Sequence, residues 1–282
     1  HTRPGYGVTP AQPFWQQKAW IALDRMVGRI TTHWVAVSQA DRRQGIEWGL
    51  FTASKVSVVR PGIDPTAFAA RIESPERDRL RAMLGVAPDQ LLVGTVSCLK
   101  PQKSPEDFVR VAALVCQRVP AARCVLVGDG ALRPKVEALL LEQGLQDRVT
   151  LLGWRRDVAA LLKAFDVFVL TSQWEGLPCA ILEARASRIP IVATRVGGAA
   201  EAIVEGIQGT LCPAGDVRAM AERVCQILED ERFRVDLRTG TQELPEEFTI
   251  QETLKQYQSL YAYLLHATRP SEDVMKLQPN RL

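Results

Sequence analysis

The 282-residue sequence is poor in the residues that build metal centres and disulfide frameworks. It has three histidines and six cysteines, and no two cysteines form a CxxC pair. Structural zinc needs closely spaced cysteine and histidine ligands, so this pattern argues against a zinc site. Most of the cysteines lie in apolar surroundings, which indicates reduced thiols in the core of a cytosolic protein.

Long apolar runs, strong charge and a dinucleotide fingerprint are also missing. No apolar run approaches the roughly 18 residues of a membrane-spanning helix. The formal net charge of +3 is too small by itself to indicate nucleic-acid binding. No GxGxxG turn follows a strand, which argues against a Rossmann-type oxidoreductase. No signal peptide is visible, although a leader lost before His1 would leave no trace.

What the chain does contain predicts an α/β domain from residue 91 onward. Hydrophobic residues make up 46% of the sequence, enough for a sizeable core. Short apolar runs alternate with longer helical patterns. The predicted strands are 91–97, 124–128, 149–153, 166–170, 189–194 and 209–212. Runs this apolar suit strands covered on both faces, so we predict a doubly wound parallel sheet.

Two of the intervening helices carry clear start signals. Ser104 is expected to cap a helix with Pro105 in its first turn and acids at 106–107 beside the positive end of its dipole. Asp216 is expected to open the last helix of the domain. The other helices are predicted near 133–143, 157–164, 178–188 and 199–204.

The first 62 residues contain too few strands for a layer of this kind. Residues 14–30 predict one amphipathic helix, and 33–38 and 55–64 predict two strands, with Ser38 as the cap of the next helix. Two or three strands cannot form an independent two-sided layer. We therefore expect this piece to belong to a larger domain that is mostly absent from the chain.

Three units are expected along the chain. Residues 1–62 are the remnant of the larger domain, residues 63–240 form the complete α/β domain, and residues 241–282 form a C-terminal unit. The stretch 61–75 is interpreted as the linker between the first two. The last unit is expected to hold a helix near 249–266 and a frayed polar tail. A helical stripe on it is formed by Leu254, Tyr257, Tyr261 and Leu264.

Residues with ligand-binding chemistry follow four of the predicted strands. Open parallel sheets bind ligands at the carboxyl ends of their strands, so these loops are expected to converge on one rim. The turn GDG at 128–130 lets backbone approach a ligand closely, and Gly197-Gly198 precedes another helix. Lys100 and Lys103 could neutralise a diphosphate. Taken singly, these features also fit an ordinary turn and solvated surface lysines.

The stretch WEGLPCAILEA adds an anion site and two carboxylates. Pro178 leads into a helix whose first free N–H groups, together with the helix dipole, suit a phosphate. Glu175 and Glu183 could each accept hydrogen bonds from a vicinal diol of a sugar or a ribose. The alternative for Glu183 is an ordinary solvent-facing glutamate on a helix.

Together these segments resemble one family, the retaining nucleotide-sugar-dependent glycosyltransferases of GT-B fold, known as group 1 or family 4. Ordered motifs at family-like spacing carry the resemblance, which covers nearly all of residues 33–230. The matching segments are VAVSQA, VSVVRPGID, CLKPQKS, LVGDGALR, VTLLGWRRDVAALLKAFDVFVLTSQWEGLPCAILEA and RIPIVATRVGGAAEAIVEGIQGTLCPAGD. The resemblance implies two Rossmann-like domains across a cleft, the N-terminal one truncated here. The C-terminal domain would bind the sugar nucleotide, and the last helix would cross back.

The resemblance also implies a role for each matched residue. Glu175 would contact the hydroxyls of the donor sugar and Glu183 the ribose, while backbone at Gly176 and Leu177 would hold the diphosphate. Lys103 matches the family's phosphate-contacting lysine. The donor-binding residues are Lys100, Lys103, Gly128, Asp129, Gly130, Gly176, Leu177, Glu183, and Trp154 and Arg155 near the base.

Three positions depart from the family's pattern or stand at its edge. Cys98 occupies the place where the family usually has an arginine, which removes one expected charge; Lys100 could replace it. The stretch HTRPGYG resembles the family's His-Thr-x-His-Gly loop on the acceptor side of the cleft. In it His1 is the candidate catalytic-centre residue besides Glu175, and Pro4 replaces the second histidine.

The resemblance implies transfer of a sugar from a nucleoside-diphosphate donor, with retention, in cell-surface polysaccharide, lipopolysaccharide or glycolipid synthesis. No metal and no cofactor besides the sugar nucleotide are expected. Backbone amides, helix ends and Lys103 would stabilise the departing diphosphate. The alternative is a module that binds the sugar nucleotide without turnover, because the acceptor domain is incomplete. The acceptor would be a saccharide or a lipid-linked molecule, and no nucleic acid is expected as a partner.

The predicted N-terminal helix bears on localisation. A basic, aromatic helix can rest on an anionic membrane surface. The relevant residues are Trp15, Lys18, Trp20, Arg25 and Arg29. An ordinary amphipathic helix with a solvated basic side is the alternative. We expect a cytoplasmic protein, either free or peripheral at the inner face of the membrane.

Overall fold

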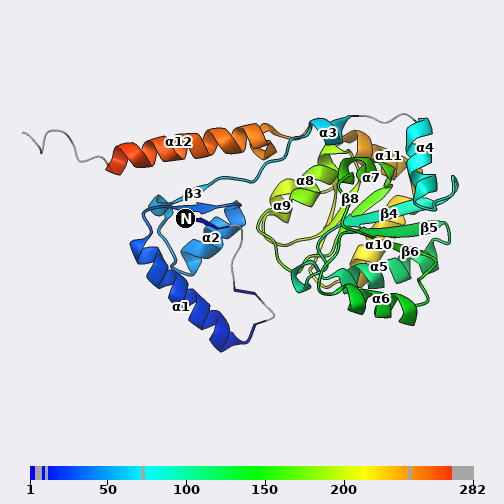
Figure 1. Ribbon diagram of the computed structural model, residues 1–282, viewed down its shortest axis with the longest axis horizontal. Helices are drawn as coiled ribbons and strands as arrows, with labels where there is room; N and C mark the ends of the chain where they lie inside the picture. Colours follow the sequence, from blue (N-terminus) through cyan, green and yellow to red (C-terminus); the bar gives the residue numbers. More distant parts are fainter. Residues whose placement is uncertain (4–7, 10–11, 71–73, 241–242, 269–282) are drawn as a thin grey trace, which may run out of the picture.

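The structure is a computed structural model that describes residues 1–268 except 4–7, 10–11, 71–73 and 241–242. It has a smaller N-terminal part and a larger α/β domain (Figure 1). The long helix α12 (Ile250–Thr268) leaves the larger domain and runs along the smaller part. The polar tail predicted after this helix lies outside the described residues.

A six-stranded parallel sheet forms the centre of the larger domain, as predicted. Its strands lie in the order β6-β5-β4-β7-β8-β9, and neighbouring strands are parallel. Their bounds are β4 Leu91–Val96, β5 Ala122–Val127, β6 Val149–Gly153, β7 Val167–Leu170, β8 Ile191–Thr194 and β9 Gly209–Cys212. Every strand predicted for this domain is therefore present.

Helices cover both faces of the sheet, because successive residues of a strand point to opposite sides. Leu92 and Val93, neighbours on β4, belong to two different core clusters. The cluster of Val93 is covered by α5 (Pro105–Arg118), α6 (Arg133–Glu142), α10 (Val217–Glu229) and α11 (Glu231–Gly240). The cluster of Leu92 is covered by α3 (Thr66–Ala69), α4 (Ser74–Met83), α7 (Val158–Ala164), α8 (Cys179–Ala186) and α9 (Ala199–Ala202). The doubly wound architecture is confirmed.

The linker predicted at 61–75 is only partly a linker. It holds α3 and the start of α4, and Phe68 and Leu80 of these helices pack against the core of the larger domain. The sequence prediction omits α3, α4 and α11. Helix α3 has only four residues, and the sequences of α4 and α11 are mostly polar, so each gives a weak periodic signal.

One of the two helix caps predicted in the larger domain is wrong. Ser104 has left-handed backbone with φ +45, and its hydroxyl donates to the Asp107 carboxylate at 2.7 Å instead of accepting from a helix amide. Asp216 does cap α10, because its carboxylate accepts from the Ala219 amide at 2.9 Å.

The smaller part is a three-stranded parallel sheet with two helices. Its strands lie in the order β1 (Thr2–Arg3), β2 (Trp34–Ala36) and β3 (Val56–Val58). The helices are α1 (Phe14–Ile30) and α2 (Gln39–Glu47). Ser38 caps α2 as predicted, by accepting from the Asp41 amide at 3.0 Å. Across the described residues no helix combines the length and apolar character needed to span a bilayer.

The last helix crosses back to the smaller part, as the resemblance implies. Leu260 of α12 is buried against Val35 and Val59. Two of the four residues predicted on the apolar stripe pack there as well, whereas Leu254 and Tyr261 are 56% and 58% exposed. The packed face of α12 therefore lies to one side of the predicted stripe.

A carboxylate of the larger domain caps a helix of the smaller part. Glu201 of α9 accepts from the amides of Gln39 and Ala40 at 3.1 and 2.8 Å, and it pairs with Arg60 at 2.9 Å. The first amides of a helix have no partner within the helix and favour negative charge, so Glu201 supplies what α2 lacks. The contact holds the carboxyl edge of the small sheet against α9.

Candidate functional site

The loops predicted to bind a ligand meet at the point where the main sheet reverses its strand order. Strand β4 pairs with β5 on one side and with β7 on the other. The chain therefore moves outward in one direction from β4 to β6 and in the opposite direction from β7 to β9. Ligands of open α/β sheets bind outside the carboxyl ends of the strands at such a switch point.

The loop after β4 is tied to the loop after β7. The Thr171 hydroxyl donates to the carbonyls of Lys103 and Ser104, each at 3.0 Å. The Gln102 side chain donates to the Trp174 carbonyl at 2.9 Å. Since these bonds join segments about seventy residues apart in the chain, they fix the side chains of both loops relative to one another.

Lys103 and Glu175, two of the predicted site residues, form an ion pair at this point. The Lys103 ammonium and the Ser172 hydroxyl, the latter at 2.6 Å, both donate to Oε1 of Glu175. Among the described residues the other oxygen, Oε2, receives only a long bond of 3.4 Å from Gln102. The Glu175 carboxylate is buried and held in one orientation, with Oε2 left able to accept hydrogen bonds from a ligand.

Glu183 lies half-buried on α8, and its carboxylate makes no hydrogen bond or ion pair within the described part of the chain. Burial raises the pKa of its carboxyl group above the usual range. A half-buried carboxylate without donors is costly. Two hydroxyl donors from a ligand would lower that cost, which agrees with the predicted role toward a diol.

The start of α8 has free backbone amides, which the predicted anion site requires. Pro178 precedes the helix, and no acceptor for the amides of Cys179 and Ala180 is found among the described residues. The preceding loop is fixed by its neighbour, because the Gly198 amide donates to the Gly176 carbonyl at 2.6 Å. A Cβ on Gly197 would lie 1.8 Å from the Glu175 carbonyl oxygen, so this close approach requires glycine.

The glycines at 128 and 130 allow a close approach, but to the chain itself. A Cβ on Gly128 would lie 2.0 Å from the Ser97 carbonyl oxygen, and one on Gly130 would lie 2.6 Å from that of Leu99. Asp129 between them accepts from the Arg133 guanidinium at 2.9 Å. These residues therefore shape the rim by packing the loop after β5 on the loop after β4.

The remaining predicted donor residues lie at the outer rim. Trp154, directly after β6, is 70% exposed and open to stack on a planar ligand. Arg155 is engaged with Asp157, at 2.8 and 2.6 Å, rather than with the rim. Lys100 is exposed, and Cys98 is half-buried with a free thiol.

The structure does not bring His1 to the glutamates. His1 stands at the amino end of β1, where its amine donates to the His33 carbonyl at 2.8 Å and its ring packs edge-on against Trp34 at 4.7 Å. The rim of the larger domain instead faces the carboxyl edge of this small sheet, where Ser38 lies beside Gly198. Pro4, the other predicted residue of this loop, lies outside the described residues.

The sequence prediction missed Ser172 and Gln102, which hold the Glu175 carboxylate and its loop. Both lie in loops that follow predicted strands, so the sequence does place them on the rim. The bonds of Gln102 to the loop of Glu175 depend on β4 lying next to β7, which no local pattern specifies, whereas Ser172 bonds to Glu175 within one loop. Within the described residues no cluster of three or more metal-ligating side chains is present.

A protein-family model described as "Glycosyl transferases group 1" matches residues 76–244. An Escherichia coli UDP-Gal:alpha-D-GlcNAc-diphosphoundecaprenol alpha-1,3-galactosyltransferase is 28% identical over 242 residues, which is 85% of this chain and 62% of that relative. A D-inositol 3-phosphate glycosyltransferase of Corynebacterium urealyticum is 31% identical over 235 residues, 80% of this chain and 55% of that relative. The chain thus spans little more than half the length of these curated relatives.

Solved glycosyltransferase structures share the fold. HepE of Anabaena in complex with UDP has a TM-score of 0.78 and 25% identity, covering 92% of this chain and 71% of HepE. Sucrose-phosphate synthase of Thermosynechococcus elongatus has a TM-score of 0.82 and 24% identity, covering 95% of this chain and 68% of that one. Since the family model covers more than half of the chain, this protein belongs to the group 1 glycosyltransferases and has their GT-B type α/β fold.

Proposed function

We propose that this chain carries the donor half of a retaining glycosyltransferase that takes its sugar from a nucleoside diphosphate. The observation that supports this most directly is the placement of Glu175, Lys103 and the start of α8 together at the switch point of the sheet. One carboxylate there has an oxygen left for sugar hydroxyls. One helix start, with a lysine beside it, can hold a diphosphate.

Each group has a defined part in the proposed reaction. The first amides of α8 and the Lys103 ammonium would hold the diphosphate and stabilise the charge that develops on it as the sugar bond breaks. Glu175 would position the sugar through its hydroxyls, because its Oε1 is already occupied by Lys103 and Ser172. Glu183 would accept from the ribose diol. No step in this proposal requires a metal.

Uracil is the base that two of the similar proteins suggest. The Escherichia coli relative is named for UDP-galactose, and HepE was solved with UDP and with UDP-glucose. The exposed Trp154 ring next to β6 offers an apolar face against which a planar base could stack. We infer that UDP binds this rim more tightly than GDP or ADP.

Calorimetric titration of UDP, GDP and ADP into this chain tests the proposal. UDP is expected to bind tightest, and Glu183→Gln is expected to weaken UDP by about 10- to 100-fold, since bonds to a charged group contribute ~1.5–3 kcal/mol. Thermal stability should stay equal or rise, because glutamine removes a half-buried carboxylate whose ionised form burial disfavours.

A matched control is Glu142→Gln, which makes the same change at an exposed position near the end of α6. It is expected to leave UDP affinity unchanged. Equal UDP affinity for Glu183→Gln and the unaltered chain would contradict the assignment of Glu183 to the ribose, and the absence of binding to all three nucleotides would contradict the donor site as a whole.

Nucleotide binding without turnover is the second candidate for this chain taken alone. The chain spans 62% of the galactosyltransferase relative, and its smaller part has a sheet of three strands in the described residues. A transfer assay run beside the calorimetry separates the two functions: binding without transfer by this chain, with transfer by a longer protein that includes it, favours the second.

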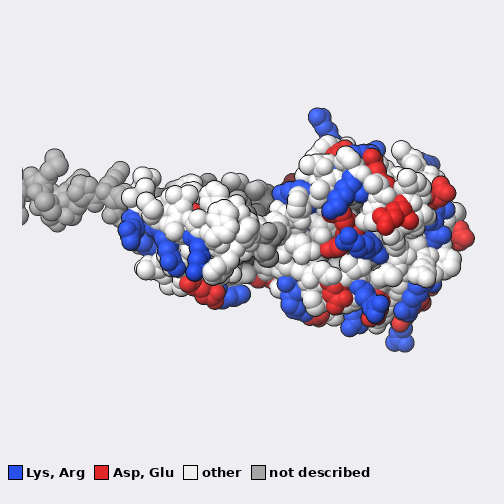
Figure 2. All heavy atoms as spheres, turned by 90° about the horizontal axis from the view of Figure 1, so that it is seen from below, with Lys and Arg blue, Asp and Glu red and all other residues white. Residues whose placement is uncertain are grey.

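The acceptor is proposed to be lipid-linked and reached at a membrane surface, with the protein cytoplasmic and peripheral. Helix α1 exposes Phe14, Trp15 and Met26 by 70%, 71% and 64%. Basic side chains gather on one side of the smaller part, beside a broad uncharged surface (Figure 2). Such a combination binds anionic bilayers. The Escherichia coli relative, named for a diphosphoundecaprenol acceptor, supports the same class.

Flotation with vesicles tests this placement. The chain is expected to float with vesicles that contain anionic phospholipid and to stay in solution with neutral ones, and Trp15→Ser with Arg25→Gln is expected to abolish flotation. Equal flotation of the unaltered chain and the double variant, with anionic and with neutral vesicles, would contradict the role of α1.

A further inference from the structure

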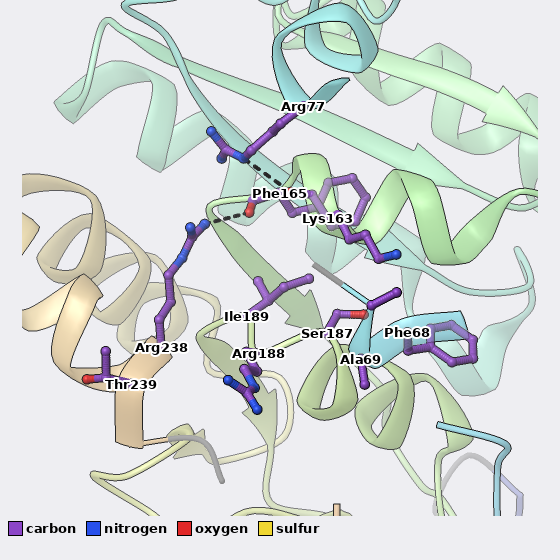
Figure 3. A pocket seen from close by; sticks show the side chains of 11 residues that line it. Phe68, Ala69, Arg77, Lys163, Phe165, Ser187, Arg188, Ile189, Arg238 and Thr239 are labelled. Carbon is purple, nitrogen blue, oxygen red and sulfur yellow. Dashed lines mark hydrogen bonds between the residues drawn. The ribbon is translucent and has the colours of Figure 1, made fainter. Parts of the chain in front are cut away.

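A separate cavity lies at the end of the main sheet opposite to the donor rim. Figure 3 shows the side chains that line it. Its volume is about 540 Å³, within the ~300–1,000 Å³ of small-molecule sites. Phe165 and Ile189, which line it, stand just before β7 and β8. The cavity therefore sits at the amino ends of these strands, whereas the donor rim is built at their carboxyl ends. Its other walls come from α3, α4, α7, α11 and the turn after α8.

The charged side chains that line this cavity are all cationic among the described residues. They are Arg77, Lys163, Arg188 and Arg238. Lys163 and Arg188 have no side-chain hydrogen bond or ion pair within the described part of the chain. Like charges in a hollow with low-dielectric walls reinforce one another's field. Such a lining attracts an anion.

Asp166, the carboxylate behind this wall, is already fully used. It accepts from Arg77 at 2.8 Å, from Arg81 at 2.9 Å and from the Leu92 amide at 2.8 Å, and it lies 3.5 Å from Arg238. Figure 3 shows Arg77 and Arg238 reaching the same stretch of backbone from two sides. Three guanidinium groups thus share one negative charge, and the cavity keeps a surplus of positive charge.

Arg188 occupies a backbone position that normally selects glycine. Its φ is +56, its amide donates to the Arg185 carbonyl at 2.9 Å, and the Ile189 amide donates to the Ala184 carbonyl at 3.1 Å. This is the Schellman pattern at the end of α8, in which glycine avoids the strain of a left-handed residue. An arginine kept in a strained position on the wall of a basic cavity points to a use for its side chain.

Two buried polar atoms at this wall have no hydrogen-bond partner among the described residues, the Ser187 hydroxyl oxygen and Nε of Arg238. Burial lowers the pKa of Arg238, and the charge of Arg77 lowers it further while Asp166 opposes this. Phe68 adds an apolar wall. The cavity thus offers cations for phosphate oxygens and an apolar surface for the organic part of a ligand.

Acidic groups stand beyond Arg188 rather than inside this cavity. A neighbouring cavity of about 620 Å³ shares Ala69 and Arg188 and is lined also by Glu243 and Glu246. Neither acid forms an ion pair with Arg188 in the described residues. The positive charge of Arg188 is therefore not cancelled by a direct partner there.

We propose that this cavity is a second ligand site, separate from the donor rim, that binds a small organic molecule carrying more than one phosphate group. The phosphates lie against Arg77, Arg238, Lys163 and Arg188, and the organic part lies against the apolar wall. The ligand bridges α4, the turn after α8 and the end of α11, so its binding stabilises the larger domain. The site is independent of which nucleotide the donor rim accepts.

Calorimetry with fructose 1,6-bisphosphate and inorganic pyrophosphate, in the presence of saturating UDP, tests the site. Both probes are expected to bind, the bisphosphate more tightly, and Lys163→Ala with Arg188→Gly is expected to weaken both by about tenfold or more, as charge-assisted bonds are lost. UDP affinity should not change. Arg188→Gly should leave the melting temperature equal or higher, because glycine suits the left-handed backbone, so the loss is not one of folding.

Two further variants make the result decisive. Arg110→Ala with Lys135→Ala removes the same charge from α5 and α6 and is expected to leave probe binding unchanged. Lys103→Ala is expected to weaken UDP and spare the bisphosphate. The proposal is overturned if neither probe binds once UDP is present, because the anion then belongs to the donor rim. It is equally overturned if Lys163→Ala with Arg188→Gly binds both probes as tightly as the unaltered chain does.

Discussion

Replacing Glu175 by glutamine is expected to lower kcat/KM for sugar transfer by about 10- to 100-fold in the full-length protein. A hydrogen bond to a charged group contributes ~1.5–3 kcal/mol, and each ~1.4 kcal/mol changes a rate by tenfold. The Glu175 carboxylate is buried, and its Oε2 receives only a 3.4 Å bond from Gln102. Sugar hydroxyls that donate to a carboxylate at this position would lose most of that energy with an amide.

The same substitution is expected to reduce sugar transfer while leaving nucleotide binding intact. Glutamine has nearly the same volume, and it releases the Lys103 ammonium that now pairs with Glu175. A lysine without that partner attracts diphosphate at least as well, so the Kd of UDP should stay equal or fall. Calorimetry with UDP and steady-state kinetics with the UDP-sugar, carried out on the same preparation, should therefore show intact nucleotide binding and lost transfer.

Glu229→Gln is the matched control, since Glu229 lies on α10 in an exposed ion pair with Arg118. It should leave both measurements unchanged, because exposed pairs contribute ~0–1 kcal/mol to stability and none of it to the site. Transfer that survives in Glu175→Gln at the level of this control would contradict the role of Glu175. A parallel loss of UDP binding would instead indicate that the substitution disrupts the loop after β7.

The main sheet could be predicted because its strands are covered on both faces. Strands such as β7 and β8 are buried along their whole length, and an apolar run bounded by turns is how such a strand appears in a sequence. Helix α11 could not be found in the same way, because Leu237 is its one buried residue. Local patterns report burial, and elements that bury little leave weak patterns.

In the candidate site, too, some features could be predicted from local sequence and others could not. Glu175 and Lys103 could be predicted, because each stands in a loop that follows an apolar strand. Their pairing with each other could not, since it depends on β4 lying beside β7 across about seventy residues of chain. The cap that Glu201 places on α2 likewise joins residues more than 160 positions apart. Such contacts follow from the topology and not from any window of sequence.

Asp166→Asn is expected to destabilise the larger domain by about 3–5 kcal/mol, the usual cost of removing one partner of a buried ion pair. Asp166 is buried and accepts from Arg81, whose side chain is 5% exposed, and from Arg77 and the Leu92 amide. An amide of the same shape keeps some hydrogen bonds but leaves buried guanidinium charge without compensation. Urea unfolding of the variant at neutral pH measures the loss. The exposed Asp147→Asn serves as control and should change stability by less than ~0.5 kcal/mol.

Acid should reduce the difference in unfolding free energy between the unaltered chain and Asp166→Asn. Burial tends to raise the pKa of Asp166, but the Leu92 amide and the charges of Arg81 and Arg77 outweigh it, so the pKa is lowered in the folded state. Folding then favours the ionised carboxylate, and its contribution is complete above the unfolded pKa of ~3.9. It is lost as the pH falls through the lower folded pKa. The stability gap between the unaltered chain and Asp166→Asn should therefore be constant from about pH 5 to 7 and shrink below pH 4. A gap that does not depend on pH would show that Asp166 acts through its shape rather than its charge.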